Sequence, residues 1–315
     1  METLVYASFN KDEQIRLQSS SGGIFYTLAS YILNKDGVVF GARFDDSWNV
    51  VHDYCEKIDD LHSFLGSKYV QSKIGDTYRQ VKDFLLKDRF VLFCGTPCQI
   101  YGLKCYLNKD YDNLILVDFV CHGVPSTKVW KTYLEKNFTI DEISNISFRN
   151  KKNGWSLYSL EITQEKNSYS CIHKNNSYIK GFLAAMYLRP SCYHCKFKGS
   201  ERSSDFTLGD LWGFDEFNLP DDFFDDKGIS LVMVHSKKGK NLFEALETCR
   251  SVPVDISLAI KKNPMIEKSI RENKKRKKFY KNGIEEGINI LEELLKPTIL
   301  KKIQRKLKRI IKRGK

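Results

Sequence analysis

Short apolar runs rich in β-branched and aromatic residues alternate along the chain with stretches of helical periodicity. The runs that predict strands are residues 37–44, 89–93, 114–120, 155–163, 205–208 and 229–235. The periodic stretches that predict helices are residues 22–33, 75–87, 98–107, 127–137 and 238–249. Such alternation is typical of strand–helix–strand units. The pattern therefore predicts an α/β fold, with a mixed, partly parallel sheet and flanking helices.

Basic residues are concentrated at the end of the chain. The 315 residues carry a net charge of +12, but residues 261–315 alone carry a net charge of +14. The remainder is close to neutral, which argues against a protein whose body binds nucleic acid. We expect residues 1–257 to form the α/β domain and residues 258–315 to form a basic, helical C-terminal extension.

The last part of this extension has a pattern of its own. Residues 296–315 contain ten Lys/Arg and no Asp/Glu, and apolar residues recur among them at helical spacing. A helix with this pattern is basic and amphipathic. Two interpretations stay open: the helix lies on an anionic membrane surface, or it packs its apolar stripe on the body of the protein or on an acidic partner.

Nine cysteines are many for a chain that begins without the pattern of a signal peptide. No apolar run approaches the length that spans a bilayer. We therefore expect a cytoplasmic protein, in which peripheral membrane contact would come only through residues 296–315. In that compartment, metal or redox chemistry explains cysteines better than a disulfide framework does.

Four cysteines stand where they could bind a metal centre. Cys192 and Cys195 form a C-x2-C pair, whose two sulfurs can reach one site. Cys98 and Cys121 each follow a predicted strand and precede a predicted helix. Both would emerge at the same edge of a parallel sheet, where α/β folds gather functional groups. Four thiolates from three loops could then hold a 4Fe–4S cluster.

Other readings of these cysteines stay open. Zinc is the competing metal, although an all-cysteine zinc site usually pairs two closely spaced knuckles and only one tight pair is present here. A cysteine at a strand end is also often a small buried apolar residue. Cys94, four residues before Cys98, is either incidental or an alternative ligand.

Two polar loops could hold a nucleotide-like cofactor. Ser20, Ser21, Gly22 and Gly23 precede the predicted helix 22–33, and small residues there leave backbone N–H groups open to an anion. The second loop offers a cation, an aromatic ring and an amide, which can bind a phosphate, stack on a ring and bond a heterocycle edge. Its residues are Ser67, Lys68, Tyr69 and Gln71.

Six segments, taken together and in order, resemble the coenzyme F420 hydrogenase/dehydrogenase beta-subunit family. They are residues 19–25, 66–72, 95–99 (Gly-Thr-Pro-Cys-Gln), 121–126 (Cys-His-Gly-Val-Pro-Ser), 189–195 and 209–213 (Gly-Asp-Leu-Trp-Gly). The resemblance covers about three quarters of the chain. The 315 residues contain no ferredoxin-like segment of the kind with which many relatives begin.

The resemblance implies an iron–sulfur flavoprotein that passes electrons between a 4Fe–4S cluster, FAD and a soluble substrate. The cluster ligands would be the four cysteines named above. Flavin contacts would come from the two polar loops and from Thr96, His122 and Gly123. A separate ferredoxin or another electron-donor protein would then supply electrons. The substrate would be the deazaflavin coenzyme of the namesakes or an intermediate of polysaccharide biosynthesis.

We expect Lys68 and His122 to take part in catalysis. Lys68 could stabilise an anionic reduced flavin, and His122 could do the same or relay protons. Two other function classes remain in view. One is a non-redox binding or scaffold protein stabilised by zinc or a cluster, and the other is a nucleotide-sugar transferase that uses the glycine-rich loops.

Overall fold

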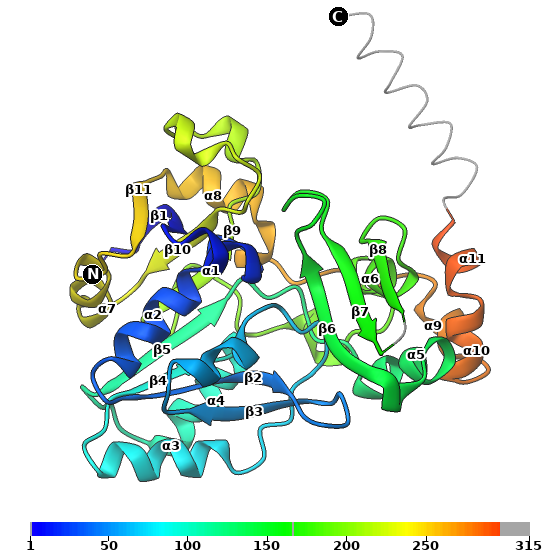
Figure 1. Cartoon of the computed structure of the whole chain (residues 1–315), viewed down its shortest axis with the longest axis horizontal. Coiled ribbons are helices and arrows are strands. Elements are labelled where there is room, and N and C mark those ends of the chain that lie inside the picture. Colours follow the sequence, from blue (N-terminus) through cyan, green and yellow to red (C-terminus); the bar gives the residue numbers. More distant parts are fainter. Residues whose placement is uncertain (1, 166, 297–315) are drawn as a thin grey trace, which may run out of the picture.

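The computed structural model describes residues 2–165 and 167–296. Eight strands form one large sheet in the order β11-β1-β10-β9-β5-β4-β2-β3 (Figure 1). Strands β2, β4, β5 and β9 are parallel neighbours, and the remaining pairs are antiparallel. The bounds are β1 Leu4–Asn10, β2 Val38–Phe44, β3 Val50–Cys55, β4 Val91–Cys94, β5 Leu114–Phe119, β9 Phe206–Asp210, β10 Ser230–Val234 and β11 Cys249–Pro253. The prediction of an α/β fold with a mixed, partly parallel sheet is confirmed.

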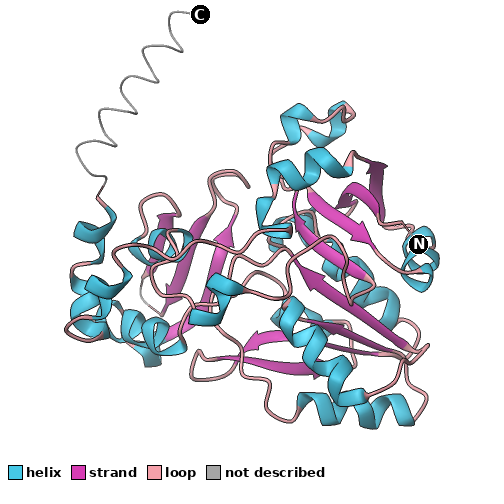
Figure 2. Cartoon of the chain, turned by 180° about the vertical axis from the view of Figure 1, so that it is seen from behind, coloured by secondary structure: helices cyan, strands magenta, loops and turns pink. Residues whose placement is uncertain are grey.

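Helices cover both faces of the parallel strands (Figure 2). Helices α2 (Ile24–Leu33) and α7 (Lys237–Glu244) pack on one face, and α3 (Thr77–Leu86) and α4 (Pro97–Leu107) pack on the other. Val39 of β2 faces α2 and its neighbour Phe40 faces α3 and α4. Because both faces are buried, these strands are continuous apolar runs, which explains why the sequence predicts them.

A second sheet of three antiparallel strands lies beside the large one (Figure 1). Its strands are β6 Ile143–Asn150, β7 Ser159–Gln164 and β8 Ser168–Ile172. Helices α5 (Thr127–Asn137) and α6 (Ser177–Leu183) pack against it around an aromatic core that includes Trp130, Phe148 and Tyr178. These rings are fully or almost fully buried, so the small sheet has a core of its own.

The C-terminal helices contact both sheets. They are α8 Ile256–Lys262, α9 Arg276–Tyr280, α10 Ile284–Asn289 and α11 Leu291–Leu295, and a further short helix near the N-terminus is α1 Glu13–Gln18. Ala259 and Ile266 join a core cluster on the large sheet, whereas Phe279 and Leu294 join the aromatic core of the small one. The domain boundary at residue 257 stays a prediction.

The predicted amphipathic segment lies almost entirely outside the described residues, because residues 297–315 are not among them. Among the residues that are described, no helix is both long enough and apolar enough to cross a bilayer.

Candidate functional site

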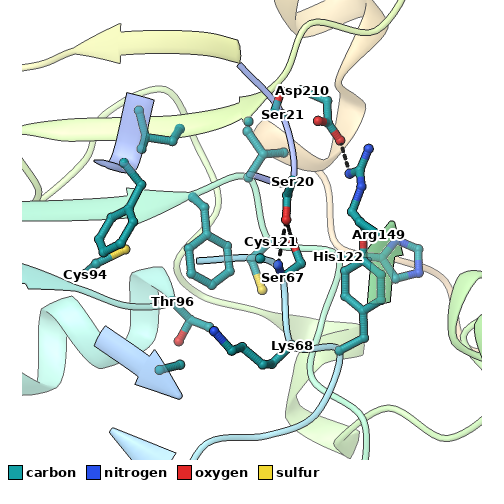
Figure 3. Close-up of a pocket in the computed structure, with 18 of the residues that line it drawn as sticks. Ser20, Ser21, Ser67, Lys68, Cys94, Thr96, Cys121, His122, Arg149 and Asp210 are labelled. Atoms are coloured by element: carbon teal, nitrogen blue, oxygen red, sulfur yellow. Dashed lines mark hydrogen bonds and ion pairs between the residues drawn. The ribbon is translucent and has the colours of Figure 1, made fainter. Parts of the chain in front are cut away.

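A cavity of about 440 Å³ lies between the carboxyl ends of the parallel strands and the small sheet (Figure 3). Volumes in this range are typical of sites for small molecules and cofactors. One wall consists of the loops before α2, around Ser67, after β4 and after β5. Side chains from or next to the small sheet, including Arg149, Tyr158 and Phe182, form a second wall. We call these the loop wall and the small-sheet wall.

The first loop of the loop wall leads into α2. Gly23 caps the helix with φ of +88° and no side-chain hydrogen bond, so the first N–H groups of α2 are not capped by a side chain. Gly22 is required by close packing, because a Cβ atom there would lie 2.4 Å from the carbonyl oxygen of Ser8. The Lys151 ammonium donates to the carbonyl of Ser21 at 2.6 Å and fixes the loop from behind. The open end of the helix suits an anion such as a phosphate.

The second loop is tied to the first. The Ser67 amide and hydroxyl both donate to Oγ of Ser20, at 2.5 and 2.8 Å. The Lys68 ammonium donates to the carbonyls of Ser63 and Leu65, at 3.0 and 2.8 Å. Burial lowers the pKa of Lys68 to about 7, against a small rise from Cys94. The charge of Lys68 in the loop wall therefore changes near neutral pH.

The turns after β4 and β5 complete the loop wall. Thr96 begins α4 in a capping box with Gln99, and its Oγ1 lies 3.1 Å from Sγ of Cys98. His122 donates from Nε2 to the carbonyl of Phe182 at 3.2 Å. Burial lowers the pKa of His122, so the neutral ring is favoured and its Nδ1 is left as the acceptor.

Cys98, Cys121, Cys192 and Cys195, which we call the cysteine group, gather at the edge of this cavity. Burial raises the pKa of Cys121 to about 12; Lys198 opposes this rise, and Cys192 and Cys98 contribute to it. Burial raises the pKa of Cys192 too, with contributions from Cys98 and Cys195. Cys192 therefore lies within electrostatic range of each of the other three thiols. The Lys198 ammonium donates to the carbonyl of Cys121 and acts electrostatically on three of the thiols.

The cysteine group has the donor chemistry of an iron–sulfur site. Within residues 2–165 and 167–296, no group of three or more His, Cys, Asp or Glu side chains is arranged to hold a single metal ion. In a 4Fe–4S cluster each cysteine binds a different iron atom, so its ligands are spaced more widely than those of one zinc ion. Four thiols from three loops supply the number and type of ligands that such a cluster takes.

Cys94 occupies a different place. It lies in the loop wall beside His52, whose Nε2 donates to the Cys94 carbonyl at 3.0 Å. Burial raises the pKa of the Cys94 thiol to about 12, with a further rise from Asp118 and an opposing effect of Lys68. The thiol is therefore protonated at neutral pH in the structure described.

The small-sheet wall is built around one buried ion pair. Arg149 of β6 donates from Nη1 to Asp210 of β9 at 2.5 Å, and Trp155 donates from Nε1 to the same carboxylate at 3.2 Å. The Arg149 side chain is 5% exposed. Its Nε and Nη2 atoms have no hydrogen-bond partner in the described part of the chain. Trp212 stacks on Trp155 with parallel rings 5.2 Å apart and remains 39% exposed at the cavity.

A buried carboxyl group, Asp118, lies at the end of β5 and also lines the cavity. Thr207 donates to it at 2.5 Å, and the Arg202 guanidinium lies 4.0 Å away. Burial raises the pKa of Asp118 to about 6, because the opposing effects of Arg202 and Thr207 are smaller.

The sequence profile of the coenzyme F420 hydrogenase/dehydrogenase beta subunit, C terminus, matches residues 88–254, which is more than half of the chain. The chain belongs to this family. The match spans β4, β5 and β9 and all four members of the cysteine group. Family membership indicates a component of a redox enzyme.

One solved structure with a similar fold comes from the F420-reducing [NiFe] hydrogenase complex of Methanosarcina barkeri. The superposition has a TM-score of 0.57 with 18% sequence identity, and covers 84% of this chain and 89% of the other. At this identity the likeness concerns the fold. A search of curated proteins gives no match.

For this member of the F420 hydrogenase/dehydrogenase beta-subunit family, most predicted flavin contacts line one cavity. Gly22 and Gln71 are not among its lining residues. Gly22 packs against β1 and β10, and the backbone N–H of Gln71 donates to the carbonyl of Pro125. The residues that do line it are Ser20, Ser21, Gly23, Ser67, Lys68, Tyr69, Thr96, His122 and Gly123.

No local sequence motif marks most of the small-sheet wall. Arg149 and Tyr158 stand in ordinary strand and turn sequence, without a local motif. Asp210 and Trp212 belong to the segment 209–213, which contributed to the family resemblance. This segment is the sequence feature that could have indicated their place in the site.

Proposed function

We propose that this protein is an iron–sulfur flavoprotein oxidoreductase, in which the cysteine group holds a 4Fe–4S cluster and the cavity holds FAD. The observation that carries the proposal is the position of Cys121, which belongs both to the cysteine group and to the lining of the cavity. Thr96 supports it, because it lines the cavity and contacts Sγ of Cys98. A cluster and a cofactor at these two places would be close neighbours.

The loop wall would bind the phosphates and ring of FAD. The uncapped N-terminus of α2 would accept a phosphate, and the Ser20–Ser67 hydrogen bonds would hold the two loops together around it. When bound, FAD supplies the chemistry that joins one-electron transfer to hydride transfer. The chain itself would position the cofactor, exclude water from the cavity and place charges beside the cofactor.

Two side chains would adjust charge and protons at the bound ring. Lys68 would place a cation near negative charge that develops in the cavity. Nδ1 of His122 would accept a proton, since its Nε2–H is already committed to the carbonyl of Phe182. Both residues hold these positions through hydrogen bonds to backbone carbonyls, which keeps them in place before any ligand arrives.

The partner in hydride exchange would be a soluble small molecule that reaches the cavity beside Trp212. Phe119, Leu183 and Trp212 all line the cavity while remaining more than a third exposed, so its entrance presents apolar surface to the solvent. A deazaflavin coenzyme of the kind that names the family is one candidate substrate, and an intermediate of polysaccharide biosynthesis is another. We also propose that the protein is cytoplasmic and that a separate protein donates electrons to it.

Anaerobic purification followed by an ultraviolet–visible spectrum and assays of iron, sulfide and flavin tests this function. About four iron and four sulfide per chain with one FAD would support it. Flavin without iron would leave an oxidoreductase but remove the cluster from the cysteine group. Zinc without flavin would favour the scaffold function, and a colourless protein that binds nucleotide sugars would favour the transferase.

A further inference from the structure

Four polar side chains form a continuous row of hydrogen bonds across β5, β9, β10 and β1, which are neighbours in the large sheet. Oγ1 of Thr207 in β9 donates to the carboxylate of Asp118 in β5 at 2.5 Å, and it lies 2.9 Å from Nε2 of His235. His235 directly follows β10, and its Nδ1 lies 3.1 Å from Oγ1 of Thr3, which directly precedes β1. We call Thr3, His235, Thr207 and Asp118 the relay residues.

The row leads from the cavity to the solvent. Asp118 lines the cavity and acts electrostatically on the thiol of Cys94, another lining residue. Asp118 and Thr207 are buried, whereas His235 and Thr3 are partly exposed. One end of the row therefore meets the cavity, the middle is shielded from water, and the other end is open to it.

The hydrogen bonds of the row all run in one direction. Because the Thr207 hydroxyl donates to Asp118, its oxygen is left to accept from Nε2–H of His235. Nδ1 of the same ring then accepts from the hydroxyl of Thr3. Burial lowers the pKa of His235 to about 4, and Arg202 lowers it further, so the ring is neutral at pH 7 and carries one proton. Each link thus joins one donor to one acceptor, which is the arrangement along which a proton can pass.

The carboxyl group at the cavity end can both bind and release a proton. Burial raises the pKa of Asp118 to about 6, against the opposing effects of Arg202, Thr207, Ser204 and Lys198. A group that exchanges its proton near the working pH is suited to proton transfer.

We propose that the relay residues conduct protons between the solvent and the cavity. The inference rests on the proposed function, because flavin chemistry takes up and releases protons as well as electrons. In one passage, Asp118 takes the hydroxyl proton of Thr207, and Thr207 takes the Nε2 proton of His235. Nδ1 of that ring takes a proton from Thr3, which water replenishes, and Asp118 gives its proton to an acceptor in the cavity. The net change is one proton moved from solvent to the cavity, and the same row runs in reverse when the cavity releases a proton.

Oxidation of the reduced protein by ferricyanide tests the relay, because ferricyanide takes single electrons and no protons. In stopped flow, the visible absorbance reports the oxidation of the flavin, and a pH-indicator dye in weakly buffered solution at pH 7 reports the release of protons. Thr207→Val keeps the shape of the side chain and breaks the row, so we expect the rate constant of proton release to fall at least about tenfold. Thr207→Ser retains a hydroxyl and should release protons as wild type does. Thr77→Val removes another buried hydroxyl, which donates to the carbonyl of Ile74, and should also match wild type.

A second variant, His235→Gln, interrupts the row at a partly exposed position and decides the matter if Thr207→Val does not fold. An unchanged rate constant of proton release in Thr207→Val and His235→Gln would mean that water in the cavity carries the proton, and would overturn the proposal. An equal fall in Thr77→Val would overturn it as well, because the effect would then belong to the loss of any buried hydroxyl. Flavin content separates these results from failure of the proposed function, in which the wild-type protein itself lacks the flavin.

Discussion

The two walls of the cavity are built in different ways. The loop wall presents backbone groups and small polar side chains such as Thr96, together with Lys68 and His122, from turns and loops near the ends of strands. The small-sheet wall presents large side chains, with Arg149 held by Asp210 and Trp212 stacked on Trp155. Backbone donors at a helix end suit phosphates, whereas a buried guanidinium and an exposed indole suit a ring. Under the proposed function, the loop wall would bind the cofactor and the small-sheet wall would face the exchange partner.

The largest expected effect is on bound iron, and it concerns the cysteine group next to the loop wall. In Cys192→Ser we expect loss of nearly all bound iron, because one of four ligands to the cluster is removed. In Cys94→Ser we expect iron content like that of wild type, because Cys94 lies beside His52 in the cavity wall. Iron and sulfide assays on anaerobically purified proteins measure this. Equal losses in the two variants would make Cys94 a ligand.

Changes in the small-sheet wall should lower the stability of the whole protein. Arg149→Met leaves the carboxylate of Asp210 buried without its cation, which should cost about 3–5 kcal/mol in the free energy of unfolding. Urea unfolding measures the loss. Arg79→Met removes one partner of the exposed Arg79–Asp76 pair and should cost less than about 1 kcal/mol.

A second variant sharpens this test. Arg149→Met/Asp210→Asn removes both charges and should recover part of the lost stability, because no uncompensated charge is left in the interior. A double variant as unstable as the sum of two single variants would mean that the pair acts through packing alone.

The sequence predicts the loop wall better than the small-sheet wall for a physical reason. Its signals are local, since Thr96, Pro97 and Cys98 stand together at a strand-to-helix turn and a parallel sheet brings such turns to one edge. Arg149 and Asp210 are 61 residues apart, and only the packing of two sheets brings them together. A local pattern cannot specify which strand of a separate sheet faces the site.

The same limit applies to secondary structure. The predicted helix at residues 238–249 ends at Glu244, and Cys249 instead begins β11, where it pairs with Asn10 at the other end of the chain. Helix α5 has the predicted bounds, Thr127–Asn137, because its apolar stripe and its start after Ser126 are both local features. Strands β1 and β11 depend on partners remote in sequence, and no short window contains that information.

A smaller effect on stability should come from Asp118, which lies on the loop-wall side. Its pKa in the folded protein is raised by burial to about 6, so folding favours the protonated carboxyl. The stabilisation is complete below about pH 4 and is lost as the pH rises through about 6. The free energy of unfolding of wild type relative to Asp118→Asn should therefore fall by about 2–3 kcal/mol between pH 4 and pH 7. A difference that does not change with pH would mean that Asp118 is ionised throughout.

The smallest effect concerns Lys68, whose ammonium lies in the loop wall. If it stabilises negative charge on reduced flavin, Lys68→Met should lower the flavin midpoint potential by about 30 mV, with flavin content unchanged. Lys73→Met, an exposed lysine further along the same segment, is the matched control and should leave the potential unchanged. Because burial lowers the pKa of Lys68 to about 7, the side chain is charged below that pH and neutral above it. The difference between wild type and Lys68→Met should thus be larger at pH 6 than at pH 8. If wild type and Lys68→Met have the same flavin potential at both pH values, Lys68 serves only to link the carbonyls of Ser63 and Leu65.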